Sequence, residues 1–436
     1  MLKDLRRCTM LGLLMALAAG AAHAQDDTAV TIGYMASNEG PVAPLSIGFH
    51  DGLADYLTLV NTRDGGVEGR PVELAVCETG FTLEGHLRCY QELAAQGAVV
   101  VLASMTEGAY AVNRAAPQVG VPVLNGGLGQ TAGADGEVFP LTFTFPANYL
   151  QAASAIVRFL EEERGGSLRG ARIGFVYHDS GFGQEPIGLL RQLAADEGFA
   201  LELHPIAPPG EDQTALWAGI AADPPDQVVL WTVGLMTPTA IGTAAAVGYP
   251  REQMLGIWWT TFEGAMRALG PAADGMRAIN FMSVGFDVPV YNQLNEIVYF
   301  GGLGNGTMNN VGQVDYNRGL MTGTYLTEAV RRALRDAPGQ AMTPARMVAG
   351  LEALDLTRAD LEALGLGEYM APIQLSCANH GGYGQLKVIQ WSAEARAWRN
   401  LSDFIAADAE IVDSMVSAEA RRFAQEVGIT PRDCPS

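Results

Sequence analysis

The residues that could do covalent chemistry follow one predicted strand. His178, Asp179 and Ser180 come directly after the apolar run Arg172–Val176, and a histidine beside a hydroxyl and a carboxylate could be part of a nucleophilic triad. Ser180 lacks the flanking glycines of a GxSxG turn, and the sequence contains no HExxH or GxxxxGK[ST] motif. A polar strand end that faces a cleft is the simpler interpretation. The sequence therefore gives no positive evidence for an enzyme.

No cofactor and no metal ion are expected either. The glycine-rich segment Gly301–Gly306 reads GGLGNG, which is not the GxGxxG spacing of a dinucleotide-binding turn between a strand and a helix. The chain has no CxxC pair, and the histidine nearest to its cysteines is His380, three residues after Cys377. This spacing is a poor match to a zinc site.

The cysteines instead indicate disulfides. Cys77, Cys89, Cys377 and Cys434 remain once the N-terminal segment described below is removed, and an even number in an oxidising compartment favours two bonds. Four cysteines allow three pairings. We favour Cys77–Cys89, which ties a strand end to the following helix, and Cys377–Cys434, which attaches the C-terminal tail to the body.

The first 24 residues have the pattern of a secretory signal peptide. Basic residues in Met1–Arg7 precede the apolar run Met10–Ala22, and Ala22-His23-Ala24 offers a cleavage site after Ala24. The run is too short to span a bilayer. We expect a periplasmic protein without a membrane anchor. Its net charge of −21 makes nucleic acid an improbable partner, because like charges repel.

Apolar runs alternate with helical patterns along most of the chain. The expected strands are Val30–Ala36, Val72–Val76, Val99–Leu102, Val121–Leu124, Arg172–Val176, Leu201–His204, Gln227–Trp231, Met254–Ile257 and Leu386–Gln390. The expected helices are Leu45–Val60, Thr82–Gln96, Glu107–Pro117, Asn148–Glu163, Gly183–Glu197, Leu216–Ala221, Pro238–Val247, Arg318–Asp336, Thr343–Leu354 and Ser417–Val427. Strand–helix alternation predicts parallel βαβ units. Because the series restarts near residue 148, we predict an α/β protein with two doubly wound parallel-sheet lobes.

Four segments in this order resemble a known family. They are VTIGYMASNEGPVA (30–43), GFHDGLADYLTLVNTRDGGVEGRPVEL (48–74), RIGFVYHDSGFGQE (172–185) and DQVVLWTVGL…AAAVGY (226–249). The chain is similar to the type I periplasmic binding proteins of branched-chain amino acid ABC importers, over nearly its whole length. The resemblance implies three crossovers, near Phe145, Ile279 and Ile373. It divides the chain into a first lobe (25–145 and 280–373), a second lobe (146–279 and 374–405) and a C-terminal helical tail (406–436).

The resemblance also implies where a ligand would bind. Carried onto matching positions, a ligand carboxylate would meet Ser104 and Thr106 in one loop and the backbone at Leu128 and Gly129 in the next. N–H groups at a helix start carry partial positive charge and suit such an anion. For Thr106 we also consider the N-cap of the following helix. Phe182 matches an aromatic residue that covers the ligand, or else is a core residue.

The sequence departs from the amino-acid binders at one position. Where they commonly have a glutamate that receives the ligand's ammonium, this chain has Trp258, followed by Trp259. Burying an ammonium without a carboxylate is costly, whereas tryptophan offers a flat apolar face. We therefore favour a ligand without an α-amino group. Tyr316 and Arg318 open a long predicted helix; Arg318 could bind a carboxylate or pair with an aspartate.

These observations predict a monomeric substrate-binding protein of an ABC importer. It would capture a small hydrophobic carboxylate, an aromatic one by preference, and deliver it to a permease in the inner membrane. One alternative is a branched-chain amino acid binder whose ligand ammonium meets Glu263 or Glu39. Another is a periplasmic sensor that reports ligand to a receptor or sensor kinase.

Overall fold

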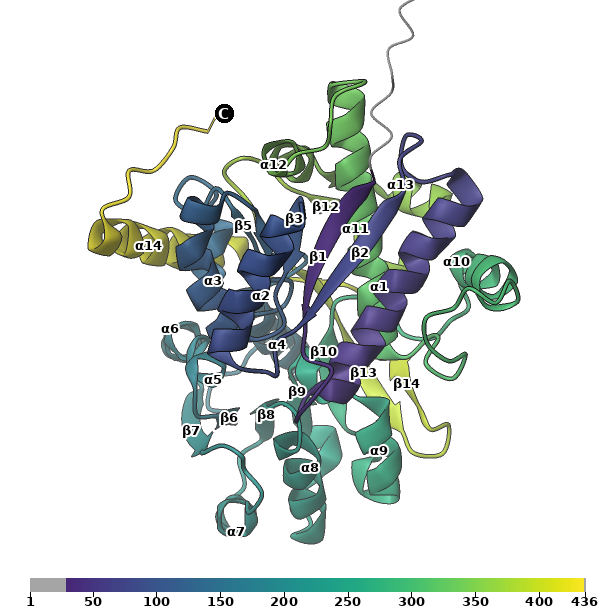
Figure 1. Ribbon diagram of the computed structural model, residues 1–436. Helices are drawn as coiled ribbons and strands as arrows, with labels where there is room; N and C mark the ends of the chain where they lie inside the picture. Colours follow the sequence, from purple (N-terminus) through teal and green to yellow (C-terminus); the bar gives the residue numbers. More distant parts are fainter. Residues whose placement is uncertain (1–28, 435–436) are drawn as a thin grey trace, which may run out of the picture.

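The first part of the chain forms a parallel sheet of five strands. The computed structural model describes residues 29–434, so the predicted signal peptide and its cleavage after Ala24 lie outside the described residues. The strand order is β2-β1-β3-β4-β5, and every pairing is parallel (Figure 1). The strands are β1 (Val30–Ala36), β2 (Val72–Glu78), β3 (Val100–Leu102), β4 (Val123–Leu124) and β5 (Thr142–Phe143). All three residues of β3 are buried, as expected for a sheet covered on both faces.

Helices from distant parts of the sequence cover this sheet. α1 (Ala43–Asp64), α2 (Leu83–Ala95) and α3 (Thr106–Val119) connect its strands, and the long α11 (Val314–Asp336) packs against α1. Glycines permit this close packing. A Cβ atom on Gly52 of α1 would lie 1.9 Å from the carbonyl oxygen of Tyr316, and one on Gly319 would lie 2.0 Å from that of Phe49. The α1–α11 contact therefore requires glycine on both helices.

The second sheet is mixed rather than wholly parallel. Its order is β14-β13-β10-β9-β8-β6-β7, with β15 also paired to β13. Its strands are β6 (Arg172–His178), β7 (Ala200–Ile206), β8 (Gln227–Trp231), β9 (Met254–Gly256), β10 (Arg277–Asn280), β13 (Gln385–Ser392), β14 (Ala397–Asn400) and β15 (Ile405–Ala406). β6 to β10 are parallel, whereas β13 runs antiparallel to both β10 and β14. The expectation of parallel sheets thus fails only at the late strands, which a short hairpin joins.

Local sequence signals explain how the helices of this half begin and end. α4 (Tyr149–Glu163) starts with a capping box in which Asn148 and Gln151 bond each other's backbone N–H. The single helix predicted over 183–197 is wrong. The structure has α5 (Gly181–Gln184) and α6 (Ile187–Glu197), because Pro186 has no N–H to donate within a continuous helix. The other helices around this sheet are α7 (Thr214–Ala222), α8 (Met236–Ala246) and α9 (Glu263–Leu269).

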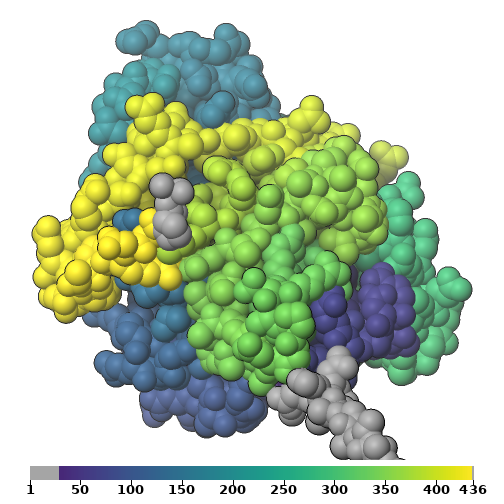
Figure 2. Space-filling model, turned by 90° about the horizontal axis from the view of Figure 1, so that it is seen from above, coloured from purple at the N-terminus to yellow at the C-terminus, as the bar shows by residue number. Residues whose placement is uncertain are grey.

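The C-terminal segment lies across the molecule and is covalently attached to it. α14 (Ala409–Val427) contacts both α4 and the short helix η1 (Thr131–Ala134), and its Phe423 stacks on Phe139 with ring centroids 4.8 Å apart. Figure 2 shows the C-terminal residues, in yellow, as a continuous band over this face. The predicted disulfides Cys77–Cys89 and Cys377–Cys434 are both present.

The remaining elements connect these layers. They are α10 (Pro289–Gln293), the π-helix η5 (Leu294–Tyr299), α12 (Pro344–Glu352), β11 (Asp355–Leu356), α13 (Arg358–Ala363) and β12 (Ile373–Gln374), with short 3-10 helices η2 (Arg251–Gln253), η3 (Trp258–Thr260), η4 (Gly270–Ala273) and η6 (Gly367–Tyr369). The chain leaves the first sheet after β5, leaves the second after β10 and re-enters it at β13. The lobe limits at particular residues stay a prediction. Within residues 29–434, no helix combines the length and apolarity that a membrane span would need.

Candidate functional site

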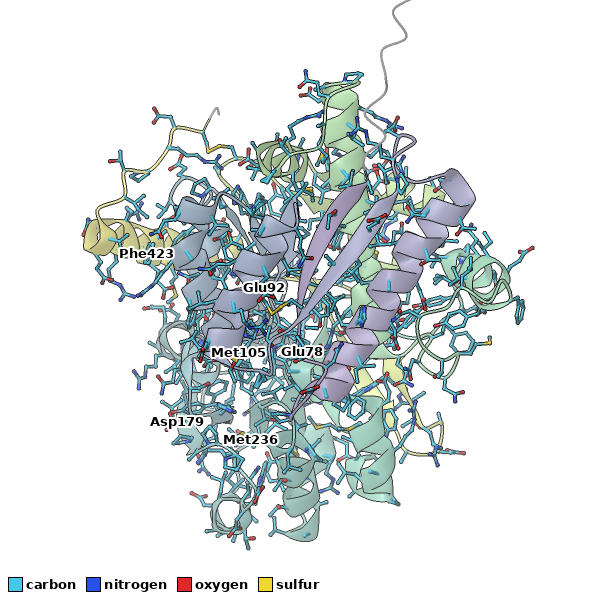
Figure 3. The ribbon with its side chains drawn as sticks, viewed as in Figure 1. Glu78, Glu92, Met105, Asp179, Met236 and Phe423 are labelled. Carbon is cyan, nitrogen blue, oxygen red and sulfur yellow. A yellow bond between two sulfur atoms is a disulfide. The ribbon has the colours of Figure 1, made fainter. Side chains whose placement is uncertain are left out.

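A cavity that is partly open to solvent lies where the carboxyl ends of strands from both sheets meet. Its wall includes residues that lie within three positions of the carboxyl ends of β3, β4, β6, β8, β9 and β10. Figure 3 shows Met105, at this wall, between the elements of the first sheet and the elements that carry Asp179 and Met236. Ligands of open α/β sheets bind at this end of the strands. The topology alone therefore marks the cavity as the candidate site.

The wall is mainly apolar. The apolar and aromatic lining residues are Tyr34, Val42, Leu45, Phe49, Phe81, Leu102, Ala103, Met105, Leu124, Leu128, Pro146, Tyr149, Phe182, Val233, Trp259, Phe281 and Met321. The hydroxyl and charged lining residues are Ser46, Ser104, Thr106, Glu107, His178, Ser180, Asp315, Arg318 and Thr322. Such a wall suits a ligand with an apolar body and few polar groups.

The predicted carboxylate-binding hydroxyls are both on the cavity wall. Ser104 Oγ lies 3.0 Å from His86 Nε2 and 2.9 Å from Ser37 Oγ. Thr106 Oγ1 lies 3.0 Å from the hydroxyl oxygen of Tyr149. Thr106 is the first residue of α3, so it is not the N-cap: Met105 holds that position and makes no side-chain cap bond. The first N–H groups of α3 therefore lack a side-chain cap at the cavity wall.

The next predicted loop contributes one residue directly. Leu128 lines the cavity, whereas Gly129 does not, although its backbone N–H donates to Thr106 Oγ1 at 3.3 Å. A Cβ atom on Gly129 would lie 2.4 Å from Thr106 Cγ2, so this approach needs glycine. Phe182 lines the cavity and packs on Tyr149 with ring centroids 5.3 Å apart. Its two interpretations, cavity wall and core, both apply.

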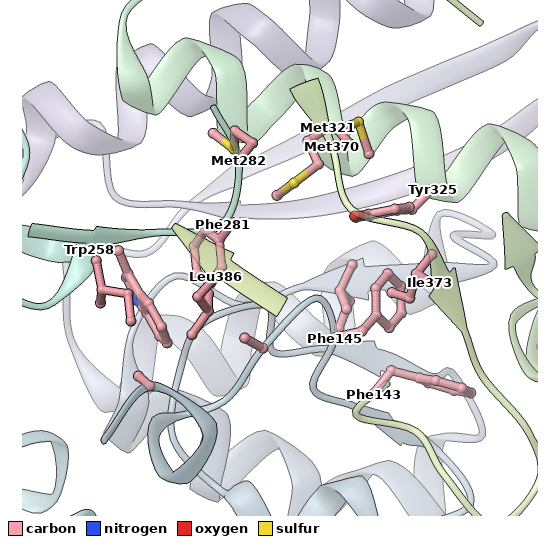
Figure 4. Packing of buried hydrophobic residues seen from close by; sticks show 14 of the residues in the cluster. Phe143, Phe145, Trp258, Phe281, Met282, Met321, Tyr325, Met370, Ile373 and Leu386 are labelled. Atoms are coloured by element: carbon pink, nitrogen blue, oxygen red, sulfur yellow. The ribbon is translucent and has the colours of Figure 1, made fainter. Parts of the chain in front are cut away.

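The two adjacent tryptophans have different surroundings. Trp258 is fully buried and does not line the cavity. Its Nε1 donates to the carbonyl of Gly127 at 3.0 Å, and its ring packs on the Phe281 ring with centroids 4.3 Å apart (Figure 4). Trp259 does line the cavity, and its Nε1 donates to the Tyr149 hydroxyl at 3.1 Å. Of the two predicted tryptophans, the structure therefore brings only Trp259 to the cavity wall.

The start of α11 contributes a buried ion pair. Arg318 and Asp315 both line the cavity, and Arg318 Nη1 lies 2.7 Å from Asp315 Oδ1. The aspartate alternative for Arg318 is therefore what the structure shows. Tyr316 does not line the cavity: its hydroxyl donates to Asp55 Oδ2 at 2.9 Å, between α11 and α1.

A second carboxylate is buried beside this pair. Glu263 accepts a hydrogen bond from the Val314 N–H at 2.9 Å but does not line the cavity. Burial, with a contribution from the nearby Asp315 charge, raises the pKa of Glu263 to about 7. Burial likewise raises the pKa of Asp315 to about 6, although the Arg318 charge opposes this shift. Glu39 does not line the cavity either.

The residues considered for catalysis are arranged differently from a triad. His178 Nδ1 lies 2.9 Å from Ser180 Oγ, and both residues line the cavity. Asp179 instead accepts a hydrogen bond from Gln184 Nε2 at 2.8 Å. Burial lowers the pKa of His178 despite the opposing charge of Glu107, so its neutral form is favoured. Within the described residues, no group of three His, Cys, Asp or Glu side chains could hold a metal ion.

Sequence reasoning missed several lining residues. Asp315 and Glu107 bring carboxylates to the wall, and Tyr149 connects Thr106 to Trp259. Asp315 begins the segment DYNRGL (315–320), in which the sequence points only to Tyr316 and Arg318 as ligand-binding residues. A signal for Asp315 was available, since a carboxylate three residues before an arginine on a helix lies on the same face.

Comparison with known proteins agrees with this geometry. The family model described as periplasmic binding protein matches residues 29–396. A solved structure described as an ABC transporter permease from the Pseudomonas fluorescens group is 31% identical, with a TM-score of 0.88, over 93% of this chain and 99% of that one. No curated protein sequence matches significantly.

Two more distant structures share the fold. An ABC transporter solute-binding protein from R. palustris in complex with benzoate is 18% identical, with a TM-score of 0.67, over 87% of this chain and 97% of that one. A branched-chain amino acid ABC transporter protein from Thermus thermophilus with bound valine is 17% identical, with a TM-score of 0.72, over 88% and 98%. The chain therefore belongs to the periplasmic binding protein family, as the substrate-binding component of an ABC transporter.

Proposed function

We propose that this protein captures a small hydrophobic carboxylate, an aromatic one by preference, and delivers it to an ABC permease in the inner membrane. The carrying observation is the pairing of an apolar, aromatic cavity with the uncapped start of α3 and the hydroxyls of Ser104 and Thr106. N–H groups and hydroxyls can hold a carboxylate without a cation. Export after cleavage at Ala24 and a monomeric state belong to the same proposal.

The relatives support this class of ligand. Structures of the same fold are described as complexes with benzoate and with 4-hydroxybenzoate, and another as a fatty acid transporter component. Their apolar carboxylates match the cavity wall described above. Binding would favour the closed arrangement of the two sheets, which the permease would then recognise.

A branched-chain amino acid is the second candidate ligand. Asp315, rather than Glu263 or Glu39, supports it, because Asp315 brings a carboxylate to the cavity wall where an ammonium could be held. The valine complex of a protein with this fold is in line with that alternative.

A thermal-shift screen of the mature protein, refolded to remove carried-over ligand, would test the proposal. The panel holds benzoate, phenylacetate, hydroxybenzoates, octanoate, leucine and valine. Ligand at about 1,000 times its Kd adds about 4 kcal/mol to the free energy of unfolding. We expect aromatic carboxylates to raise Tm and the amino acids to leave it unchanged. A shift with leucine or valine alone would select the second candidate.

Two threonine variants would locate the carboxylate. Thr106→Val removes the lining hydroxyl while keeping the side-chain shape, and we expect it to weaken benzoate binding about tenfold. Thr324→Val is the matched control, because Thr324 Oγ1 bonds the Leu320 carbonyl within α11 and the residue does not line the cavity. Equal Kd values for the two variants would remove Thr106 from the site.

A further inference from the structure

The ion pair at the start of α11 leaves two polar atoms free at the cavity. Asp315 and Arg318 are only 4% and 3% exposed, and both line the cavity. Asp315 Oδ1 receives Arg318 Nη1, but Asp315 Oδ2 and Arg318 Nε have no hydrogen-bond partner within residues 29–434. Leaving a buried carboxylate oxygen unpaired is unfavourable, so a ligand group that donates to Asp315 Oδ2 would gain affinity.

The arginine cannot turn to satisfy itself. Arg318 Nη2 donates to Thr261 Oγ1 at 2.9 Å and to the Trp258 carbonyl. The guanidinium carbon lies 5.3 Å from the centroid of the Trp259 ring and 5.6 Å from that of Phe281. Contacts with two aromatic rings and at both terminal nitrogens hold the guanidinium in this position beside Asp315.

The charges of the pair favour a neutral ligand group. One carboxylate and one guanidinium already balance, so an added ammonium or carboxylate would bring an uncompensated charge into a buried site. A hydroxyl has one donor and free acceptor lone pairs. It can donate to Asp315 Oδ2 without bringing a charge into the site.

This pair is distinct from the carboxylate position at α3. Arg318 lies over Trp259, whose Nε1 bonds the Tyr149 hydroxyl, which in turn lies 3.0 Å from Thr106 Oγ1. The aromatic side chains of Trp259 and Tyr149 thus stand between the two polar positions. A ligand that uses both needs an apolar body with a polar group at each of two places.

We propose that the ligand carries a hydroxyl group on its apolar body, which donates to Asp315 Oδ2. The inference rests on the proposed function, since it assigns the second polar group of the same hydrophobic carboxylate. It makes Asp315, whose other oxygen is held by Arg318, the residue that distinguishes hydroxylated ligands from their plain counterparts.

Calorimetry on the wild-type protein at pH 8 tests this with a ligand series. The series is benzoate, 3- and 4-hydroxybenzoate, the matching fluorobenzoates and 4-(aminomethyl)benzoate. Fluorine is close to a hydroxyl in size but cannot donate. We expect one hydroxybenzoate isomer to bind at least tenfold more tightly than both benzoate and its fluoro counterpart.

Two variants assign the preference to Asp315. In Asp315→Asn, the remaining oxygen stays with Arg318 and an NH₂ group replaces Oδ2, so the hydroxyl preference should disappear. Glu263→Gln is the matched control, because it changes a neighbouring buried carboxylate that does not line the cavity, and it should keep the preference. If Asp315→Asn does not fold, the comparison of hydroxybenzoates with fluorobenzoates in the wild type still shows whether the site prefers a hydroxyl group.

The outcomes separate this inference from the proposed function. Benzoate binding without any hydroxyl preference, or a preference that persists in Asp315→Asn, would overturn the inference and leave the proposed function intact. Tightest binding of 4-(aminomethyl)benzoate, lost in Asp315→Asn, would replace the hydroxyl by an ammonium. No binding by any member of the series would overturn both.

Discussion

Glu185 Oε1 accepts a hydrogen bond of 2.7 Å from the backbone N–H of Thr131, which joins segments that belong to different sheets. Glu185 follows α5 beside the second sheet, whereas Thr131 begins η1 after β4 of the first. The other carboxylate oxygen accepts from the Tyr110 hydroxyl at 2.5 Å and from the Gln130 N–H at 3.2 Å. One side chain of the second part of the chain thus satisfies three donors of the first.

Glu185→Gln should weaken the closed arrangement and with it ligand binding. The glutamine amide has one acceptor oxygen where the carboxylate has two. Its NH₂ group would face an N–H or O–H donor that would then have no acceptor. We expect a loss of about 1–3 kcal/mol, seen as a Kd about tenfold higher or more. Calorimetry gives the Kd, and small-angle scattering gives the opening of the ligand-free protein. Glu362→Gln, at an exposed position, is the control. Unchanged Kd and radius of gyration would contradict this role.

Glu263 should make stability fall as pH rises towards neutrality. Its folded-state pKa of about 7 lies above the ordinary glutamate value of about 4.5, so the folded state holds the proton over a pH range in which the unfolded state has released it. Stability from this group is complete below about pH 4.5 and is lost as pH rises to about 7. The loss is on the order of 3 kcal/mol. Urea unfolding of the wild type and Glu263→Gln at pH 5 and pH 7.5 measures it; equal slopes with pH in both proteins would refute the assignment.

The adjacent tryptophans should separate stability from binding. Trp258→Leu creates space in the core beside Phe281, and we expect the free energy of unfolding to drop by about 3 kcal/mol. Trp259→Leu removes part of the cavity wall and the bond to Tyr149, so the main effect should be a Kd raised about tenfold. Chemical unfolding and calorimetry on both variants give the comparison. Weaker binding in the Trp258 variant at unchanged stability would reverse the two roles.

The two disulfides should differ in their contribution to stability. Cys377–Cys434 closes a separation of 57 residues and Cys77–Cys89 one of 12. Loop-closure entropy predicts about 4 kcal/mol for the longer and about 3 kcal/mol for the shorter. Replacing each pair by alanine and measuring urea unfolding tests the order. A larger loss for the Cys77–Cys89 pair would show that local strain or residual structure outweighs loop length.

Local signals in the sequence were sufficient for most of the fold. The strand predicted over Gln227–Trp231 has those limits in the structure, because its apolar run is continuous and bounded by polar and small residues. Asn148 and Gln151 likewise fixed the start of α4. β5, β10, β11, β12, β14 and β15 were missed, since strands of two to four residues are too short to show a periodicity of their own.

The candidate site was only partly accessible from sequence. The loops that contain Ser104, Thr106 and Phe182 could be named because each follows a recognisable strand, and ligands bind where such strands end. The family resemblance then pointed to these three residues within the loops. The sequence could not show which of Trp258 and Trp259 lines the cavity, because they are adjacent residues of the same type. Only the direction of each ring, set by Gly127 on one side and Tyr149 on the other, distinguishes core from cavity.

The sequence by itself determined the order of strands and helices, the family and the loops that approach a ligand, since these depend on local pattern and chain order. The tertiary structure alone decided which charges meet there. Asp315 and Arg318 face the cavity because glycines on α1 and α11 let these two helices pack closely, although more than 200 residues separate them. A contact between segments so distant depends on the packing of the whole chain.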